Sequence, residues 1–217
     1  MKIGIIGAGN VGVGLGKFWA KNTHQIMLSY SRDDAKLEAA AATIGKGAKT
    51  GSPAEAAGFG DVVVLAVPWA AMLDAVKAAG TLEGKILFST VNALSPDMSS
   101  MEVGTTTSAA EEIARLAPGS RVVEALPSFA ELLHRGSTEL DGQQATIFFC
   151  GDDKGAKEVV AGLLAETGVE TIDAGPLRNA RFIEPAMMLL VQLAYPLGLG
   201  PVAMKILRER REVKHGK

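Results

Sequence analysis

The stretch Lys2–Gly12, KIGIIGAGNVG, decides the fold of this 217-residue chain. Its opening apolar residues predict a fully buried strand, and the residues from Val11 to Lys21 predict a helix. The turn between them carries a G-x-G-x-x-G pattern, formed by Gly7, Ala8, Gly9, Asn10, Val11 and Gly12. In such a turn the first glycine permits a tight bend, the second a close approach of a pyrophosphate, and the third close helix–strand packing. The stretch therefore predicts a dinucleotide-binding site at the N-terminus of a helix.

Apolar runs alternate with helical patterns along the rest of the chain. Further strands are predicted at 25–30, 61–67, 85–90, 121–126, 145–150 and 169–173, and helices at 34–42, 70–79, 109–117, 154–167 and from about 178 onward. This alternation predicts an α/β fold, a doubly wound parallel sheet of the Rossmann, NAD(P)-binding type with a small C-terminal helical part.

The composition excludes several classes of protein and of site. The net charge is −2 and no basic stripe is visible, which argues against a nucleic-acid partner. The single cysteine, Cys150, excludes an internal disulfide and a Cys-rich metal site, and its apolar neighbours predict a buried side chain. The three histidines lack metal-ligand spacing, so no metal is expected.

The uncharged stretch 185–204 has nearly the length of a membrane span. It contains three prolines, which favour a helix, a turn and a second helix, so we expect no membrane association. The first strand begins at the start of the sequence, with no signal-peptide pattern before it. We therefore expect a cytoplasmic location.

The end of the second predicted strand indicates which dinucleotide binds. A site for NAD usually places an acidic residue there to hold the ribose hydroxyls. This chain has Ser31 and Arg32 instead, with Lys36 one helical turn further on. The fixed fork of donors on arginine matches phosphate oxygens, and the serine hydroxyl can donate another bond. These residues predict NADP(H) as the cofactor, and Asp33 is expected to cap the next helix.

Two further strand ends supply candidate cofactor contacts. Val67 and Pro68 end the third predicted strand, where they can line the path of the cofactor. Asn92 follows the fourth strand, near the expected place of the nicotinamide, and either bonds the cofactor or serves the turn. No catalytic side chain is expected, and Glu184 is expected on a helix surface or in a pair between helices.

Several stretches of the sequence resemble the family of NADP oxidoreductases that depend on the deazaflavin coenzyme F-420 (F420). They are GIIGAGNVG (4–12), SYSRDDAK (29–36), VVVLAVPW (62–69), TSAAEEIARLAPGSRVVEAL (107–126), FFCGDDKGAKEVV (148–160) and IDAGPLRNARFIEP (172–185). The last stretch is the most specific, because a generic dinucleotide site does not require it. The resemblance implies hydride transfer between NADP(H) and F420, which needs positioning and exclusion of water more than acid–base side chains.

The resemblance also implies a cleft for the second ring system, between the loop after the fifth strand and the terminal helices. Its candidate residues are Leu126, Pro127 and Ser128, where family members often carry Asn or His followed by Thr. This departure leaves two alternatives: an NADPH-dependent flavin or ferric reductase on the same frame, and a non-catalytic NADPH-binding protein.

These interpretations lead to an expected organisation of the chain. Residues 1–175 should form an NADP-binding Rossmann domain. Residues 176–217 should form C-terminal helices that complete the second-substrate cleft and a dimer contact. The expected partners are a small-molecule hydride acceptor and a second copy of the chain, because the terminal helix carries a run of apolar residues.

Overall fold

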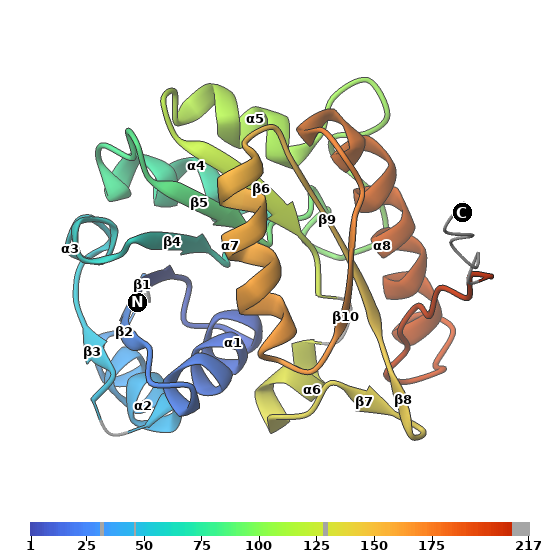
Figure 1. Ribbon diagram of the computed structural model, residues 1–217, viewed down its shortest axis with the longest axis horizontal. Coiled ribbons are helices and arrows are strands. Elements are labelled where there is room, and N and C mark those ends of the chain that lie inside the picture. The colour runs from blue at the N-terminus through green and yellow to red at the C-terminus, as the bar shows by residue number, and fades with distance from the viewer. Residues whose placement is uncertain (31–32, 46, 128–129, 210–217) are drawn as a thin grey trace, which may run out of the picture.

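The computed structural model describes residues 1–30, 33–45, 47–127 and 130–209 of the chain. Within them, an eight-stranded sheet carries helices on both faces (Figure 1). Six strands run parallel: β1 (Lys2–Ile6), β2 (Gln25–Ser29), β3 (Lys49–Thr50), β4 (Val62–Leu65), β5 (Ile86–Ser89) and β6 (Arg121–Ala125). Their order across the sheet is β3-β2-β1-β4-β5-β6. This confirms the predicted doubly wound arrangement.

The strand order reverses between β1 and β4. The chain leaves β1 into α1 (Asn10–Lys21), which packs on one face of the sheet, and leaves β4 into α4 (Trp69–Ala79), which packs on the other. Because the two connections diverge to opposite faces, a crevice opens at the carboxyl ends of these two strands.

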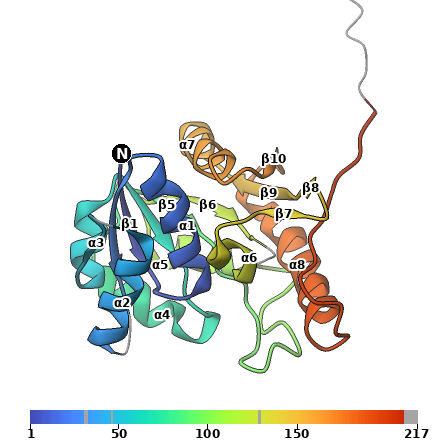
Figure 2. The same ribbon diagram turned by 90° about the horizontal axis from the view of Figure 1, so that it is seen from below.

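Two groups of helices cover the two faces (Figures 1 and 2). The face of α1 also carries α2 (Asp34–Ile44), α6 (Ala130–Arg135) and α7 (Lys154–Ala165). The opposite face carries α3 (Pro53–Phe59), α4, α5 (Ala109–Leu116) and α8 (Ala180–Ala194). Successive residues of a strand point to opposite faces, so the sheet separates two apolar layers.

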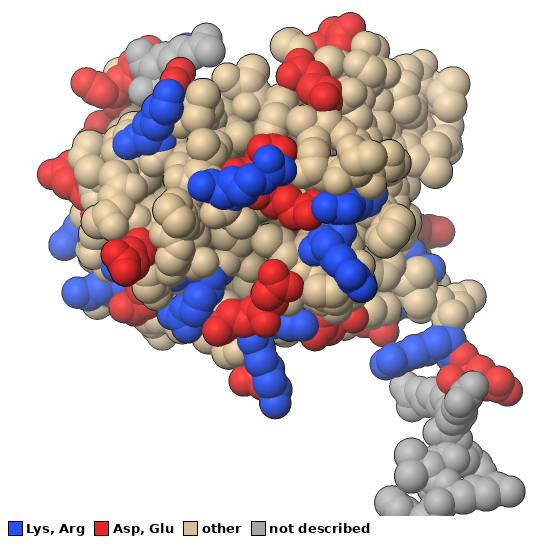
Figure 3. All heavy atoms as spheres, turned by 90° about the horizontal axis from the view of Figure 1, so that it is seen from above, with Lys and Arg blue, Asp and Glu red and all other residues tan. Residues whose placement is uncertain are grey.

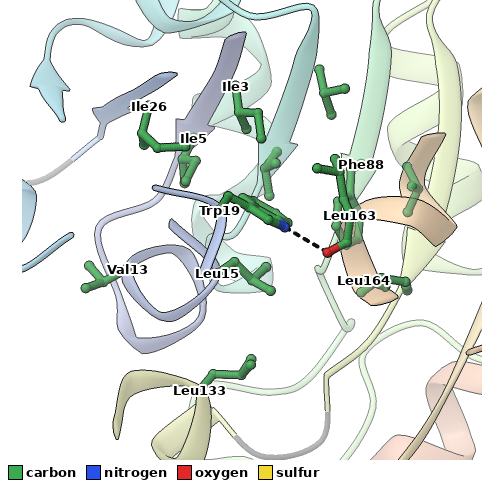
Figure 4. Close-up of a cluster of buried hydrophobic side chains, with 14 of the residues drawn as sticks. Ile3, Ile5, Val13, Leu15, Trp19, Ile26, Phe88, Leu133, Leu163 and Leu164 are labelled. Carbon is green, nitrogen blue, oxygen red and sulfur yellow. Dashed lines mark hydrogen bonds between the residues drawn. The ribbon is translucent and has the colours of Figure 1, made fainter. Parts of the chain in front are cut away.

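Trp19 on α1 anchors the first of these layers (Figure 4). It is fully buried, and its Nε1 donates a 2.8 Å hydrogen bond to the carbonyl of Leu163 on α7. Its ring centroid lies 6.2 Å from that of Phe88 on β5. The indole thereby joins α1, α7 and the sheet, because its bulk gains from burial and its N–H still finds a partner.

The far side of the sheet departs from the predicted parallel pattern. β9 (Thr146–Gly151) runs antiparallel to β6, and β10 (Glu170–Asp173) then pairs parallel with β9. The connection from β6 to β9 holds only α6 and a small hairpin, β7 (Glu139–Leu140) with β8 (Gln143–Gln144). The described residues of this connection form no long helix to carry the chain back across the sheet, and the next strand returns in the opposite direction.

The C-terminal part also differs from the prediction of two helices. A 3₁₀ turn, Leu177–Asn179, leads into α8, and the described residues after α8 form no second helix. Gly198 and Gly200 there have positive φ angles of 69° and 76°. The chain then runs extended along the body, where the amide of Thr146 donates to the carbonyl of Met204 at 2.8 Å (Figure 2).

The described helices and surface also bear on two further expectations. Among these residues, no helix is long and apolar enough to cross a membrane. On the face drawn in Figure 3, acidic and basic side chains are interspersed. That face therefore presents no single-sign patch of the kind that nucleic-acid-binding surfaces use.

Candidate nucleotide site and acceptor cleft

The turn from β1 to α1 needs two of its glycines for reasons internal to the protein. Gly7 has φ of 131°, and a Cβ built there would lie 2.1 Å from the carbonyl oxygen of Ala66. A Cβ at Gly12 would lie 2.0 Å from the carbonyl oxygen of Gly7. Both substitutions would force backbone against backbone, so these two glycines set the shape of the turn.

Gly9 differs from both of these neighbours. Its backbone is extended, with φ of −85° and ψ of −174°, and a Cβ built there would meet no atom within 4 Å. Neither packing nor backbone conformation requires a glycine at this place. The empty space in front of Gly9 fits a ligand that approaches the backbone closely, as a pyrophosphate does.

The N-terminus of α1 supports the same interpretation. Gly9 is its N-cap residue, so no side chain caps the helix, and no acidic residue stands in its first turn. Within the part of the chain that the structure describes, the free N–H groups of that turn therefore have no side-chain cap, and the positive end of the helix dipole has no acidic residue in the first turn. This arrangement suits a phosphate group.

A hollow of about 260 Å³ lies in front of this turn. It brings together three predicted glycine-loop residues and the two predicted residues after β4, lined by Gly7, Ala8, Gly9, Tyr30, Ala66, Val67, Pro68 and Ala71. Asn10 is exposed and Val11 half-buried in the first turn of α1. The crevice therefore brings together candidate contacts from two strand ends, those of β1 and β4, whereas Lys36 and Asn92 are not among its described lining residues.

A second hollow, of about 620 Å³, continues past Tyr30. It lies between α2, the chain around β3 and the start of α3, lined by Tyr30, Asp34, Leu37, Glu38, Thr50, Gly51, Ser52, Pro53 and Ala78. Among the described lining residues, the carboxylates of Asp34 and Glu38 border the second hollow, and those of the first hollow include no carboxylate. The second hollow therefore suits an uncharged group better than a phosphate.

The predicted 2′-phosphate residues are only partly placed. Ser31 and Arg32 lie outside the described residues. Lys36 is exposed in the first turn of α2. Asp33 caps that helix, as predicted: its carboxylate accepts from the amides of Ala35 at 2.9 Å and Lys36 at 3.3 Å.

Asn92 has a structural contact that the sequence did not reveal. Its Nδ2 donates to the carbonyl oxygen of Glu184 at 3.2 Å, which ties the loop after β5 to α8. Its Oδ1 is buried and has no hydrogen-bond partner among the described residues. The side chain of Asn92 therefore links the loop after β5 to α8, while its Oδ1 accepts no hydrogen bond from the described residues.

The cleft residues predicted after β6 do not share one environment. Leu126 is buried in the apolar layer beneath α8, so its side chain is not a cleft wall. Pro127 is half-buried, and Ser128 lies outside the described residues. The end of α8 closes this region, because Gln192 donates to the carbonyl of Met98 at 2.8 Å and the hydroxyl of Tyr195 donates to Glu131.

The largest departure from the sequence analysis is a buried pair of carboxyl groups. Glu124 on β6 is fully buried and Glu184 on α8 is 1% exposed, so the expectation of a helix-surface position for Glu184 is wrong, whereas the alternative of a contact between helices agrees with the structure. The amide of Ala110, in the first turn of α5, donates to Glu184 at 3.2 Å. The sequence RVVEAL (121–126) indicates such a pair, because it places a glutamate inside an apolar strand and a buried carboxyl group requires a partner.

The two carboxyl groups influence each other's pKa. Burial raises the pKa of Glu124 well above its usual range, and the adjacent Glu184 adds to the rise. Burial also raises the pKa of Glu184, against the opposing effect of the amides of Ala109 and Ala110 and of the Glu124 carboxyl. Burial therefore favours the neutral form of Glu124 beside Glu184, since two buried charges close together are costly. Among the described residues, Oε1 of Glu124 and Oε2 of Glu184 have no hydrogen-bond partner.

Cys150 lies beside this pair and is inert. Its Sγ is 3.9 Å from Oε2 of Glu124 and fully buried, as the sequence predicts. Burial, followed by the charges of Glu124 and Glu184, raises the pKa of the thiol far above its usual range. A thiol held protonated in this way is no nucleophile.

Comparisons with known proteins agree with this geometry. The family described as NADP oxidoreductase coenzyme F420-dependent matches residues 2–93. An F420-dependent NADP reductase of Methanocaldococcus jannaschii is 32% identical over 209 residues, which cover 89% of this chain and 92% of that protein. A crystal structure of a protein from Arthrobacter sp. FB24, described as a "putative F420 dependent NADP-reductase", has a TM-score of 0.85 at 28% identity, and the match covers 96% of this chain and 100% of that one.

A more distant likeness shows the fold alone. A reductive aminase from Aspergillus terreus, in complex with NADPH and ethyl-5-oxohexanoate, has a TM-score of 0.68 at 19% identity and is covered over 63% of its length. In the described part of this chain, no group of three or more His, Cys, Asp or Glu residues is placed to hold a metal ion. The likeness to the reductase of M. jannaschii, by contrast, covers 89% of this chain at 32% identity. The chain belongs to the family of coenzyme F420-dependent NADP oxidoreductases, and the protein is an NADP-dependent oxidoreductase.

Proposed function

We propose that the protein transfers hydride between NADP(H) and the deazaflavin F420. The observation that carries the nucleotide half is the open space at Gly9, in front of a helix N-terminus that no side chain caps. The acceptor half rests on the similarity to the protein from M. jannaschii, which is named an F420-dependent NADP reductase.

The crevice residues suggest an orientation for the bound NADP(H). Its pyrophosphate lies against Gly9 and the first turn of α1, and Val67 and Pro68 border the path toward the nicotinamide. Ser31, Arg32 and Lys36 receive the 2′-phosphate, as the sequence predicts. Each contact fixes the position of the dinucleotide, which is what a direct transfer between two rings requires.

The side chains near the acceptor cleft position groups rather than exchange protons. The bound nicotinamide and deazaflavin supply the hydride chemistry themselves. Burial and the hydrogen bond to Glu131 raise the pKa of Tyr195 to about 12. Glu184 is buried and accepts a hydrogen bond from the amide of Ala110. Neither side chain is a ready proton donor, which disfavours the acid-assisted reduction of an imine or a keto group.

An absorbance assay tests the proposal. Purified protein is mixed with NADPH and oxidised F420, and loss of the visible absorbance of the deazaflavin is followed, with FMN and ferric citrate in parallel wells. We expect rapid bleaching of F420 only. Bound NADPH with reduction of FMN or ferric citrate instead of F420 would reject F420 as the acceptor, and NADPH binding without reduction of any acceptor would reject the enzyme activity.

We also propose that the protein is a homodimer. α8 exposes two large apolar side chains, Phe182 at 73% and Leu189 at 59%, and Leu197 in the following segment is 67% exposed. A second copy packed on this surface would bury them. Light scattering should give the mass of two chains for the wild type and of one chain for Phe182→Ser. The cytoplasmic location and the division of the chain at residue 175 stay predictions.

A further inference from the structure

Tyr30, the residue that directly follows β2, has an unusual backbone. Its φ is +66°, in the left-handed region that bulky side chains rarely adopt. A tyrosine in this region stores strain, and residues held in this way are found at ligand sites more often than elsewhere. The conformation therefore calls for a reason outside ordinary turn formation.

The position of its ring supplies a reason. Tyr30 lines both hollows of the crevice, the one in front of Gly9 and the one between α2 and α3. Its hydroxyl spans the crevice to the carbonyl of Ala71 on α4, at a long 3.4 Å. The ring is half-buried and packs against the apolar layer under α4, so one part of it stays open. The ring of Tyr30 therefore lies between the two hollows, and its hydroxyl makes only one long hydrogen bond.

The charges around the two spaces assign their occupants. The space in front of Gly9 is backed by a free helix N-terminus and suits the pyrophosphate. The space beyond Tyr30 is bordered by Asp34 and Glu38, which repel phosphate but tolerate an uncharged base with an amino group. A dinucleotide with its pyrophosphate at Gly9 must therefore lead its adenine past the ring of Tyr30.

We propose that Tyr30 is the residue that determines affinity for the adenine end of the dinucleotide, by stacking its ring on the base. This inference rests on the proposed nucleotide site but not on the identity of the acceptor. Stacking of a base on an aromatic ring typically contributes a factor of roughly ten or more in affinity. The left-handed backbone places the ring across the crevice, and the bound base repays the strain.

Two matched variants separate stacking from a purely structural role. Tyr30→Phe keeps the ring and loses the hydroxyl, whereas Tyr30→Leu keeps apolar bulk and the same backbone but loses the aromatic face. Each is titrated by calorimetry with NADPH, with adenosine 2′,5′-bisphosphate as the adenine half, and with reduced nicotinamide mononucleotide as the other half.

We expect Tyr30→Phe to match the wild type and Tyr30→Leu to lose about tenfold in affinity for NADPH and for the adenine half, but none for the nicotinamide half. Melting temperatures are measured for all three proteins, so that a misfolded variant is recognised. Contacts between tyrosine ring protons and adenine protons in the NMR spectrum of the wild type give a direct second readout.

Equal affinities of Tyr30→Leu and Tyr30→Phe for the adenine half would overturn the role of Tyr30 and leave the nucleotide site intact. So would an absence of contacts between tyrosine and adenine protons when the adenine half is bound. Failure of the wild type to bind NADPH at all would overturn both this inference and the proposed function. Failure to reduce F420 with normal NADPH titrations would overturn only the latter.

Discussion

The turn between β1 and α1 and the contact between β6 and α8 belong to the same sheet but are built differently. The turn is made of backbone, and residues five apart in sequence, Gly7 and Gly12, fix its shape. The contact is made of two side chains, Glu124 and Glu184, that are sixty residues apart and fully enclosed. The residues that a backbone turn requires can be recognised in the local sequence. The burial of two side chains against each other can be recognised only in the folded structure.

Substitution of Gly12 should have the largest effect, because its constraint is internal. In Gly12→Ala the new Cβ meets the carbonyl oxygen of Gly7 at 2.0 Å, which no side-chain movement can relieve. We expect the free energy of unfolding to fall by about 3 kcal/mol or more. Urea unfolding followed by circular dichroism measures it, and a near-normal stability would show that the turn is not closed as described.

Substitution of Gly9 sharpens the contrast within the same turn. The Cβ in Gly9→Ala meets nothing within 4 Å, so we expect the stability to change by less than about 0.5 kcal/mol. NADPH affinity should fall by about 2–3 kcal/mol, as expected for lost hydrogen bonds to a charged group. Calorimetry beside urea unfolding distinguishes the two effects, and a Gly9→Ala protein that binds NADPH normally would refute the assignment of this space to a pyrophosphate.

Substitution of Arg32 tests the choice between NADP and NAD. Arg32 lies outside the described residues, and its role is inferred from its place after β2. We expect Arg32→Ala to weaken NADPH binding by about 1–3 kcal/mol and to leave NADH binding nearly unchanged. Lys36→Ala is a matched control on the next helical turn and should have a smaller effect. Equal losses for the two dinucleotides would show that Arg32 does not read the 2′-phosphate.

The carboxyl pair should show itself in the pH dependence of stability. The pKa of Glu124 is raised in the folded protein, so stability is full below the unfolded value near 4.5 and is lost as the pH rises toward the folded value. Glu124→Gln keeps a donor to Glu184 and removes this titration. We expect the variant to be about 1 kcal/mol more stable than the wild type at pH 8 and to have a flatter profile.

Glu111 provides a control of opposite sign. The bond from Arg181 lowers the pKa of Glu111, so its contribution to stability is present at neutral pH and is lost as the pH falls. Glu111→Gln should therefore be less stable than the wild type at pH 7, and the difference should shrink in acid. If the stability of Glu124→Gln and of the wild type changes with pH in the same way between pH 5 and 8, Glu124 does not have the raised pKa that its burial implies.

The sequence could predict the features whose causes lie within a few residues. The strand-to-helix turn and the cap by Asp33 follow from local pattern, and the structure has both. Similarly local patterns start α3, at the capping box of Ser52 and Glu55, and α5, at the cap by Ser108.

Other features depend on partners that no local pattern names. The antiparallel direction of β9 follows from the absence of a long crossover helix between residues 126 and 145. The burial of Glu184 follows from the position of Glu124 and of the first turn of α5. In such cases the sequence contains an unusual residue, such as a glutamate in an apolar strand, but does not identify the residue that contacts it.

Isotope transfer tests the central claim most directly. NADPH carrying deuterium at both C4 positions is mixed with oxidised F420 and the protein in ordinary water, and the reduced deazaflavin is analysed by mass spectrometry. Direct hydride transfer predicts one carbon-bound deuterium in each molecule of product. A reduced deazaflavin without deuterium, or no reduced deazaflavin while NADPH is bound, would contradict it.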